Sequence, residues 1–529
     1  MARPAQKARN STTQTTKKPA TKVSVKTALK KSSTSASLTR KMSSKPTPEP
    51  TTAPRKKRGR PAETNSSVKP SKRLKSDLAI NTVPSQKLDV YVFGLGDCGE
   101  LGLGPTARNG KKPRNVKRPR INDLLNAKTV GVVQIAVGGM HCVALTQDQK
   151  ILTWGVNNTG TLGRDTTWEA PVQDIDANSD DEDDEGTLNP KESTPTAIPT
   201  EFFGKHAKTF VQVAATGSAS FALTDDGSVY GWGTFRGNDG AIGFSTAGAV
   251  EAARKKDPEL LLQRRPTPIP QLKKIKFFAG GGNHVQALDH KGNVFAWGSG
   301  EQCQLGRHVM DRTRAQALTP CQFGLPKNKI TSVSCGVFHS FAIDIDGHVY
   351  AWGLNNFGQT GIAHGAGESG ALIEKPTIVK ELEPYKIKSI EGGTHHSIAC
   401  TEDGRLLLWD RCDDSQAGVL LNNLPQEDLI FDSRNKPRIL LKPTIIPGIL
   451  ADSIAAGIDD SFAITKDGEA YSWGFSANYR TGLGSEDSVN EATLIANTAV
   501  KGKRLTFAGC GGQFSVLAGP ATSTPTNGV

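Results

Sequence analysis

Short apolar runs separated by glycine-containing turns recur along most of the chain. In residues 334–361, two apolar runs at 341–343 and 349–352 flank the dipeptide Asp346-Gly347. Runs of this length and composition are typical of β-strands, and an Asp-Gly dipeptide readily adopts the positive φ angles of a tight turn. The pattern therefore predicts a β-hairpin with glycine-rich segments on both sides.

The same pattern returns at 138–155, 216–233, 281–298, 392–410 and 456–474, with partial copies at 89–104 and 508–519. The first partial copy lacks the front half of the repeat and the second lacks the back half, so together they complete one unit. We therefore predict an all-β fold, a seven-bladed β-propeller closed by its N- and C-terminal half-repeats. The less regular segments between hairpins, such as 376–390, must supply the remaining strands. The seven hairpins end at Gly94, Gly155, Gly233, Gly298, Gly353, Asp410 and Gly474.

Positive charge is concentrated at the N-terminus. The formal net charge of the chain is +13, and residues 1–88 hold 22 Lys and Arg against three acidic residues, a net +19, which leaves the remainder near −6. Residues 1–87 contain almost no large apolar side chains, so they cannot bury enough surface to offset chain entropy. We predict a disordered basic arm over 1–87, a propeller over 88–519 and a disordered tail over 520–529.

Two basic clusters within the arm, at 54–61 and 69–75, have the layout of a bipartite nuclear-import signal. Residues 58–61, Arg-Gly-Arg-Pro, also resemble the core of an AT-hook, in which arginines enter a narrow minor groove. A generic basic tail that contacts DNA non-specifically is a third interpretation. The candidate import and DNA-contact residues are Arg55, Lys56, Lys57, Arg58, Arg60, Lys72, Arg73 and Lys75.

The sequence offers little support for covalent or cofactor chemistry. Gly94, Gly96 and Gly99 match the G-x-G-x-x-G pattern of dinucleotide sites, but no amphipathic helix follows and the same spacing recurs in other repeats. The repeat histidines lie one blade apart, which is not a metal-ligand spacing, and the eight cysteines lack C-x-x-C spacing. We expect no metal, no cofactor and no catalytic residue that forms a covalent bond.

No apolar run approaches the length of a membrane helix, and the N-terminus lacks the apolar core of a signal peptide. We therefore expect a soluble intracellular protein with no membrane partner and a monomeric state on its own.

Three insertions interrupt the repeats. Residues 108–120 hold seven basic residues and no acid, whereas 174–185 hold eight acids in twelve residues. A run of like charge is most often a solvated loop, and we interpret the acidic stretch in that way. Residues 234–243, TFRGNDGAIG, stand where other repeats carry a loop of the N-x-x-G-x-L-G type. Because insertions vary while the repeat does not, we expect functional loops among them.

The repeat over 89–519, with its G-x-x-H, D-G and W-G positions, resembles that of the regulator of chromosome condensation family. Residues 162–166, LGRDT, and 234–243 resemble segments of the nuclear members of that family, and the second resembles their protruding β-wedge. The resemblance implies guanine-nucleotide exchange on the small GTPase Ran, on chromatin in the nucleus, which generates Ran-GTP for nucleocytoplasmic transport and mitosis. The implied partners are Ran, DNA and nucleosomes or histones.

In that family the GTPase docks on one propeller face. The resemblance implies a GTPase-binding set made of one aspartate, the wedge, and polar residues of the inner strands. Gly217 and Ser218 stand where the family has a functional aspartate, and so does Asn283, while Asp459 and Asp460 replace a repeat histidine. The implied set is Asp97, His141, Arg236, Asn238, Asp239, Asn283, His284, His395 and His396.

Alternative interpretations remain. A repeat histidine beside glycine is often a structural residue hydrogen-bonded at the inner edge of the propeller. The family's arginine-bearing nucleosome loop is shortened here to residues 326–329. The competing function is a non-catalytic chromatin scaffold whose propeller binds histones, and a scaffold has no need of the wedge. A regulatory propeller of a ubiquitin ligase is a third possibility, but the chain lacks the catalytic domain of such a ligase.

Overall fold

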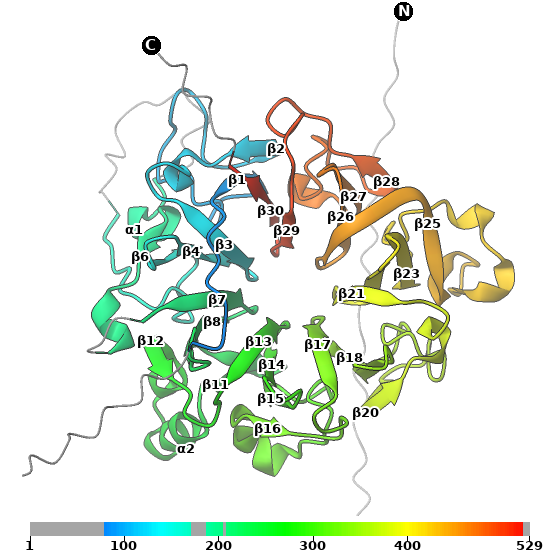
Figure 1. Ribbon diagram of the computed structural model, residues 1–529, viewed down its shortest axis with the longest axis horizontal. Helices are drawn as coiled ribbons and strands as arrows, with labels where there is room; N and C mark the ends of the chain where they lie inside the picture. Colours follow the sequence, from blue (N-terminus) through cyan, green and yellow to red (C-terminus); the bar gives the residue numbers. More distant parts are fainter. Residues whose placement is uncertain (1–78, 171–186, 205–207, 522–529) are drawn as a thin grey trace, which may run out of the picture. The chain divides into compact units, whose positions relative to one another are not determined.

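The computed structural model describes residues 79–170, 187–204 and 208–521. These residues form seven four-stranded antiparallel blades around a common centre (Figure 1). Five blades are separate sheets, and the other two share the 20-residue strand β25 (Pro437–Ala456), whose first part pairs with β23 and whose end pairs with β26. The predicted seven-bladed β-propeller is confirmed.

Strands from both ends of the described region share one blade. β1 pairs with β30 from Leu88 opposite Pro520 to Gly94 opposite Phe514. Ladder hydrogen bonds along this pair leave neither terminal strand as an open sheet edge. The blade consists of β29 (Phe507–Cys510), β30 (Phe514–Pro520), β1 (Leu88–Gly94) and β2 (Val116–Ile121).

The next three blades follow the chain, and each places its first strand nearest the centre (Figure 1). The second blade holds β3 (Val132–Val137), β4 (His141–Thr146), β5 (Ile151–Gly155) and β6 (Thr196–Ala197). The third holds β7 (Phe210–Ala215), β8 (Ala219–Thr224), β9 (Val229–Gly233) and β12 (Gln263–Pro268). The fourth holds β13 (Ile275–Gly280), β14 (His284–Asp289), β15 (Val294–Gly298) and β16 (Cys321–Gln322).

The last three blades repeat this order. The fifth holds β17 (Ile330–Cys335), β18 (His339–Asp344), β19 (Val349–Leu354) and β20 (Leu372–Ile378). The sixth holds β21 (Ile387–Gly392), β22 (His396–Thr401), β23 (Arg405–Arg411) and the first part of β25, to which β24 (Leu429–Phe431) also pairs. The seventh holds the end of β25 with β26 (Asp460–Thr465), β27 (Ala470–Gly474) and β28 (Val489–Leu494).

Outside the blades, two strands and ten short helices lie in the connections of the described residues. The strands β10 (Phe235–Gly237) and β11 (Gly240–Gly243) form a separate hairpin. The helices are α1 (Pro190–Ser193), α2 (Thr246–Lys255) and the 3-10 helices η1 (Asp123–Leu125), η2 (Thr200–Phe203), η3 (Pro258–Leu261), η4 (Asp311–Leu318), η5 (Lys380–Leu382), η6 (Leu421–Asn423), η7 (Gln426–Asp428) and η8 (Ala477–Tyr479). No helix among the described residues is long and apolar enough to cross a membrane.

The repeated tryptophan joins neighbouring blades as well as filling their cores. Trp232 and Trp352 are fully buried, and each indole N–H donates to a backbone carbonyl in the loop of the preceding blade, at 2.7 Å to Thr161 and 2.9 Å to Gln304. A buried indole needs such a partner, because an unpaired donor costs about 1–3 kcal/mol. Trp154 and Trp473 make the same contact with the carbonyls of Glu100 and Gln416, whereas the buried Nε1 of Trp409 has no such partner, so the tryptophan links four pairs of neighbouring blades in this way.

Each blade presents two kinds of connection on opposite faces. In the fifth blade His339 pairs with Gly353 at one end of the β18–β19 hairpin, and the turn at Gly347 closes the other end with φ 88°. The loops before the second strand and after the third therefore gather on one face, which we call the exit face. The tight turns lie on the other, which we call the turn face.

Several sequence predictions lie outside the described residues. These are the basic arm up to residue 78 with all eight of its candidate contact residues, the acidic stretch at 174–185, and the tail from 522 onward. The root of the arm is described. The backbone N–H groups of Ile80 and Asn81 donate to the carbonyl of Asp225, and Asn81 Nδ2 donates to the carbonyl of Ile275 at 2.9 Å. These contacts hold residues 80–81 on the turn face.

Candidate binding face and wedge hairpin

The hairpin β10–β11 stands on the exit face of the third blade, and we call residues 235–243 the wedge. Its base is apolar: Phe235 is fully buried and its ring stacks on that of Phe244, with centroids 5.9 Å apart. Its tip is polar, and Arg236, Asn238 and Asp239 are all exposed. A buried base under an exposed polar tip is the arrangement expected of a loop that contacts a partner.

Backbone geometry at the tip depends on glycine. Gly240 has a φ of +113°, a conformation that residues with a Cβ rarely adopt, and open space surrounds it. Gly237 allows close packing, because a Cβ there would overlap the ends of the Glu301 and Arg314 side chains of the fourth blade and displace them.

Asn283 links the wedge to the inner edge of the next blade. Its side-chain Oδ1 accepts hydrogen bonds from the backbone N–H of Arg236 and from Ser218 Oγ, both at 3.1 Å. The one hydroxyl hydrogen of Ser218 is shared between this amide oxygen and the carbonyl of Thr234, which lies 3.0 Å from Oγ. The two residues that stand where the family has aspartates therefore fix the base of the wedge.

Three of the implied GTPase-binding histidines are buried. His141, His284 and His396 expose 1%, 0% and 0% of their surface, and each Nε2 lies 2.8–2.9 Å from the hydroxyl of a serine in the following blade. Burial lowers the pKa of His141 to about 4 and that of His284 to about 3. Since buried side chains cannot touch a docked partner, we assign these three to the propeller framework and remove them from the proposed contact set. The serine partners are Ser220, Ser340 and Ser461.

The serine relays the contact to a loop carbonyl. Ser340 donates its one hydroxyl hydrogen to the carbonyl of Gln304, the same oxygen that receives the indole N–H of Trp352, and therefore accepts from the Nε2–H of His284. His339, which the family resemblance did not place in the binding set, is likewise buried and lies 2.9 Å from Ser397 Oγ. The repeated histidine thus acts in an inter-blade contact, which is the structural alternative that the sequence left open.

His395 and Asp97 remain accessible on the exit face. His395 is half-buried, its ring lies 4.8 Å from that of Phe357, and Nδ1 lies 3.4 Å from Gln359 Nε2. Burial, with a smaller effect from the nearby Arg411 charge, lowers the pKa of His395. Asp97 is exposed in the loop after β1.

A charged cluster beside His395 was missed by the sequence analysis. Arg411 pairs through Nη1 with Asp459 Oδ1 at 3.0 Å and through Nε with Asp413 Oδ1 at 2.6 Å, and its guanidinium lies 5.6 Å from the centre of the Phe357 ring. Asp459 was noted only as a departure from the repeat. Its pairing with a residue 48 positions away could not be read from the chain.

Asp460, the other substituted residue, faces the interior. It is buried where other repeats carry the histidine, and its Oδ1 lies 3.9 Å from Arg480 Nη1. Burial raises its pKa to about 7, against the attraction of Arg480. Asp460 therefore belongs to the framework, like the histidines that it replaces.

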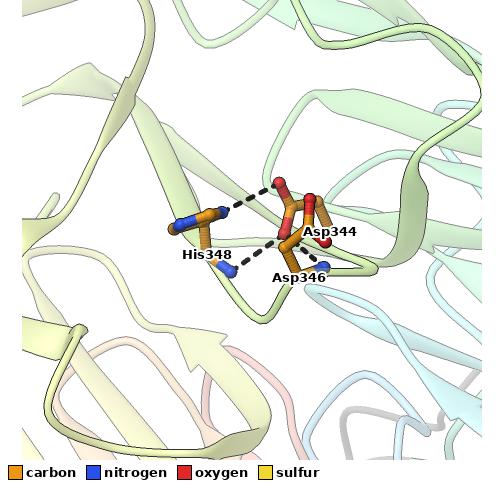
Figure 2. A group of neighbouring side chains, drawn as sticks. All are labelled: Asp344, Asp346 and His348. Atoms are coloured by element: carbon orange, nitrogen blue, oxygen red, sulfur yellow. Dashed lines mark hydrogen bonds and ion pairs between the residues drawn. The ribbon is translucent and has the colours of Figure 1, made fainter.

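Among the residues that the structure describes, one group of side chains has the ligand types and the spacing of a metal site. Asp344, Asp346 and His348 place their ligand atoms within 4.8 Å of one another in the β18–β19 turn (Figure 2). Asp344 Oδ1 already accepts from the backbone N–H groups of Asp346 and His348, and Lys329 Nζ pairs with Asp346 at 3.0 Å. In the equivalent turn of the third blade, Thr224 caps the chain in the same way. The group is therefore a turn cap, and we assign no metal to it.

The fold and this face define a β-propeller whose exit face carries the blade loops and one exposed hairpin. The chain belongs to the RCC1-like domain family, and the match to that family covers residues 89–517.

Known proteins are similar to this chain over most of its length. The chain is 40% identical to the guanine nucleotide exchange factor SRM1 of Saccharomyces cerevisiae over 441 residues, which cover 82% of this chain and 88% of that protein. It resembles the crystal structure of Prp20p from Saccharomyces cerevisiae, a study that also concerns binding to Gsp1p and histones (38% identity, TM-score 0.72, 83% and 93% covered). It also resembles yeast RCC1 (Prp20) bound by Kap60 (37% identity, TM-score 0.73, 88% and 97% covered).

Proposed function

We propose that this protein is a guanine-nucleotide exchange factor for the small GTPase Ran. The observation that carries the proposal is the wedge, which replaces the ordinary blade loop and joins a buried aromatic base to an exposed polar tip. The similarity of the chain to the exchange factor SRM1, over most of the length of both proteins, supports the same conclusion.

An exchange factor of this kind makes and breaks no covalent bond. It binds the nucleotide-free GTPase more tightly than the loaded one, and by linkage the nucleotide then binds the complex more weakly by the same factor. A wedge directed at the phosphate and magnesium site would act by displacing the elements that hold them. Arg236 and Asp239 supply charges of both signs for such contacts.

The proposed contact surface is the exit face. It includes Asp97, Arg236, Asn238, Asp239 and His395, all of which are exposed or half-buried. Asn283 supports the wedge from below, and we add the neighbouring Arg411 and Asp459 because they occupy the same face as His395.

We further propose that the protein acts in the nucleus on chromatin, with DNA and histones as partners and an import carrier that recognises the arm. Two similar structures support this part, since Prp20p binds histones and Kap60 binds yeast RCC1 (Prp20). The root of the arm lies on the turn face, opposite the wedge.

The competing function is a scaffold that binds histones without promoting nucleotide release. To distinguish the two, Ran is loaded with a fluorescent guanine nucleotide and its release is followed after addition of the purified protein and excess unlabelled nucleotide. We expect release far faster than the intrinsic rate. Release at the intrinsic rate, with histone binding retained, would favour the scaffold.

A further inference from the structure

We infer that Glu301 and Arg314 of the fourth blade hold the wedge of the third blade in its working position. They are positioning residues, which we call the clamp, and the inference rests on the proposed exchange function. Glu301 lies in the loop after β15, and Arg314 lies in η4. No repeat position marks either residue, because Glu301 occupies a variable position of the repeat's exit loop and Arg314 lies in the irregular connection that follows it.

The first contact of the clamp is with the backbone of the wedge tip. Glu301 Oε2 accepts a hydrogen bond from the backbone N–H of Asn238 at 2.7 Å. An N–H at the tip of a two-stranded hairpin has no ladder partner of its own, and a carboxylate is a stronger acceptor than a neutral oxygen. This hydrogen bond therefore fixes the direction in which the Asn238 peptide points.

The second contact joins charges across the two blades. Arg314 Nη1 lies 3.3 Å from Asp239 Oδ2, and Arg314 Nη2 pairs with Glu301 Oε1. The side chains of Arg314 and Glu301 are 27% and 21% exposed, whereas that of Asp239 is 87% exposed. Because the clamp residues are largely shielded from water, their pairing is screened less than that of an exposed ion pair.

The third observation is steric. The clamp packs so closely on Gly237 that a Cβ at that position would overlap both the Arg314 guanidinium and the Glu301 carboxylate. Gly237 does not have a positive φ, so close approach rather than backbone strain explains the glycine. The rest of η4 is held in place by Thr246 of α2, whose Oγ1 donates to the carbonyl of Ala315 at 2.8 Å. The clamp thus stands on a supported base.

The expected consequence is specific to the wedge. Removal of either clamp residue leaves Phe235 in the core, so the blade stays folded, while the tip loses the groups that orient it. Nucleotide release then slows although the residues that touch the GTPase are unchanged. Since the other contacts of the exit face remain, the maximal release rate should fall more than the half-saturating concentration rises.

The experiment uses the full chain with Glu301→Ala, Glu301→Gln and Arg314→Ala. The matched control is Arg312→Ala, which removes an exposed arginine from the same 3-10 helix without touching the wedge. Three quantities are measured on each preparation: melting temperature, hydrogen–deuterium exchange of the peptide that spans 235–243, and fluorescent nucleotide release from Ran at a series of Ran concentrations.

We expect wedge amides to exchange on the order of tenfold faster in Glu301→Ala and Arg314→Ala, with melting and the Arg312→Ala control unchanged. Hydrogen exchange of the wedge in Glu301→Gln should lie between wild type and Glu301→Ala, because the Gln amide oxygen can still accept from Asn238 but carries no charge for Arg314. The maximal release rate should fall in the same order.

If the wedge amides exchange hydrogen at the wild-type rate in Glu301→Ala and Arg314→Ala, the inference is overturned. Faster hydrogen exchange of the wedge amides with normal nucleotide release would also overturn it, provided that the double variant Arg236→Ala, Asp239→Ala releases nucleotide slowly. If that double variant also releases nucleotide normally, the proposed function of the wedge fails, and the role of the clamp in exchange fails with it.

Discussion

Removal of a relay histidine should change how stability depends on pH. Wild type is compared with His284→Asn, which keeps a polar group but cannot titrate. His284 is fully buried and its pKa is lowered to about 3, whereas an unfolded histidine titrates near 6.5. Because the folded pKa is depressed, the stabilising contribution of neutral His284 is present above pH 6.5 and is lost as pH falls toward 3.

The magnitude follows from these two pKa values. At pH 7.5 the effect of linkage is negligible, and at pH 5 protonation of the unfolded histidine favours unfolding by about 2 kcal/mol. At neutral pH the variant should be less stable by about 1–3 kcal/mol, since it loses packing and one buried hydrogen bond to Ser340. That deficit should then shrink by about 2 kcal/mol as the pH is lowered to 5.

The assay is denaturant unfolding of both proteins at pH 7.5, 6.5, 5.5 and 5. Only the difference between them is informative, because burial raises the pKa of Glu391 and Asp460 to about 7, and these groups stabilise the fold as pH falls. A deficit that stays constant from pH 7.5 to pH 5 would refute the assignment of a neutral buried histidine at this position.

Three further predictions follow from the framework and the arm. Asp460→Asn should be more stable than wild type at pH 8 by up to roughly 4 kcal/mol, because a carboxyl with a raised pKa destabilises the fold as pH rises through that pKa. This advantage should vanish by pH 4. Denaturant unfolding at both pH values tests this, and equal stability at pH 8 would contradict it. Deletion of residues 1–78 should weaken DNA binding and make it less dependent on salt, since fewer counterions are released. An unchanged salt slope in a binding titration would contradict the claim that the arm contacts DNA. Truncation after residue 507 removes β30, the partner of β1, and should cause aggregation through exposed edges, whereas cooperative melting at the wild-type temperature would be incompatible with that role.

The repeat made most of the fold predictable. Short apolar runs around Asp346-Gly347 and its copies specify hairpins locally, so the number of blades could be counted from the chain. The outer strands were harder, because β6 and β16 have only two residues each and are set by pairing rather than by pattern. The sharing of β25 by two blades likewise has no local signal.

The binding face was predictable only in part. The wedge could be located because residues 234–243 break the repeat, but Glu301 and Arg314 contact it from 60 or more positions away, at places that the repeat does not distinguish. The histidines gave the opposite result. His141, His284 and His396 match the family pattern, yet burial and the serine relay show that their side chains serve blade packing.

The wedge itself provides the most direct test of the proposed exchange function. The double variant Arg236→Ala, Asp239→Ala is compared with the double variant Arg264→Ala, Glu259→Ala. The second removes an exposed ion pair between β12 and η3, which follow the wedge in the chain. Melting and nucleotide release from Ran are measured on one preparation of each protein. Exposed substitutions of this kind usually change stability by less than about half a kcal/mol, so melting should be unchanged in both.

The wedge variant should release nucleotide on the order of a hundredfold more slowly, which corresponds to roughly 3 kcal/mol of contacts made better with nucleotide-free Ran. The control variant should match wild type. Normal release by a wedge variant that melts normally would contradict the central claim that this hairpin drives exchange.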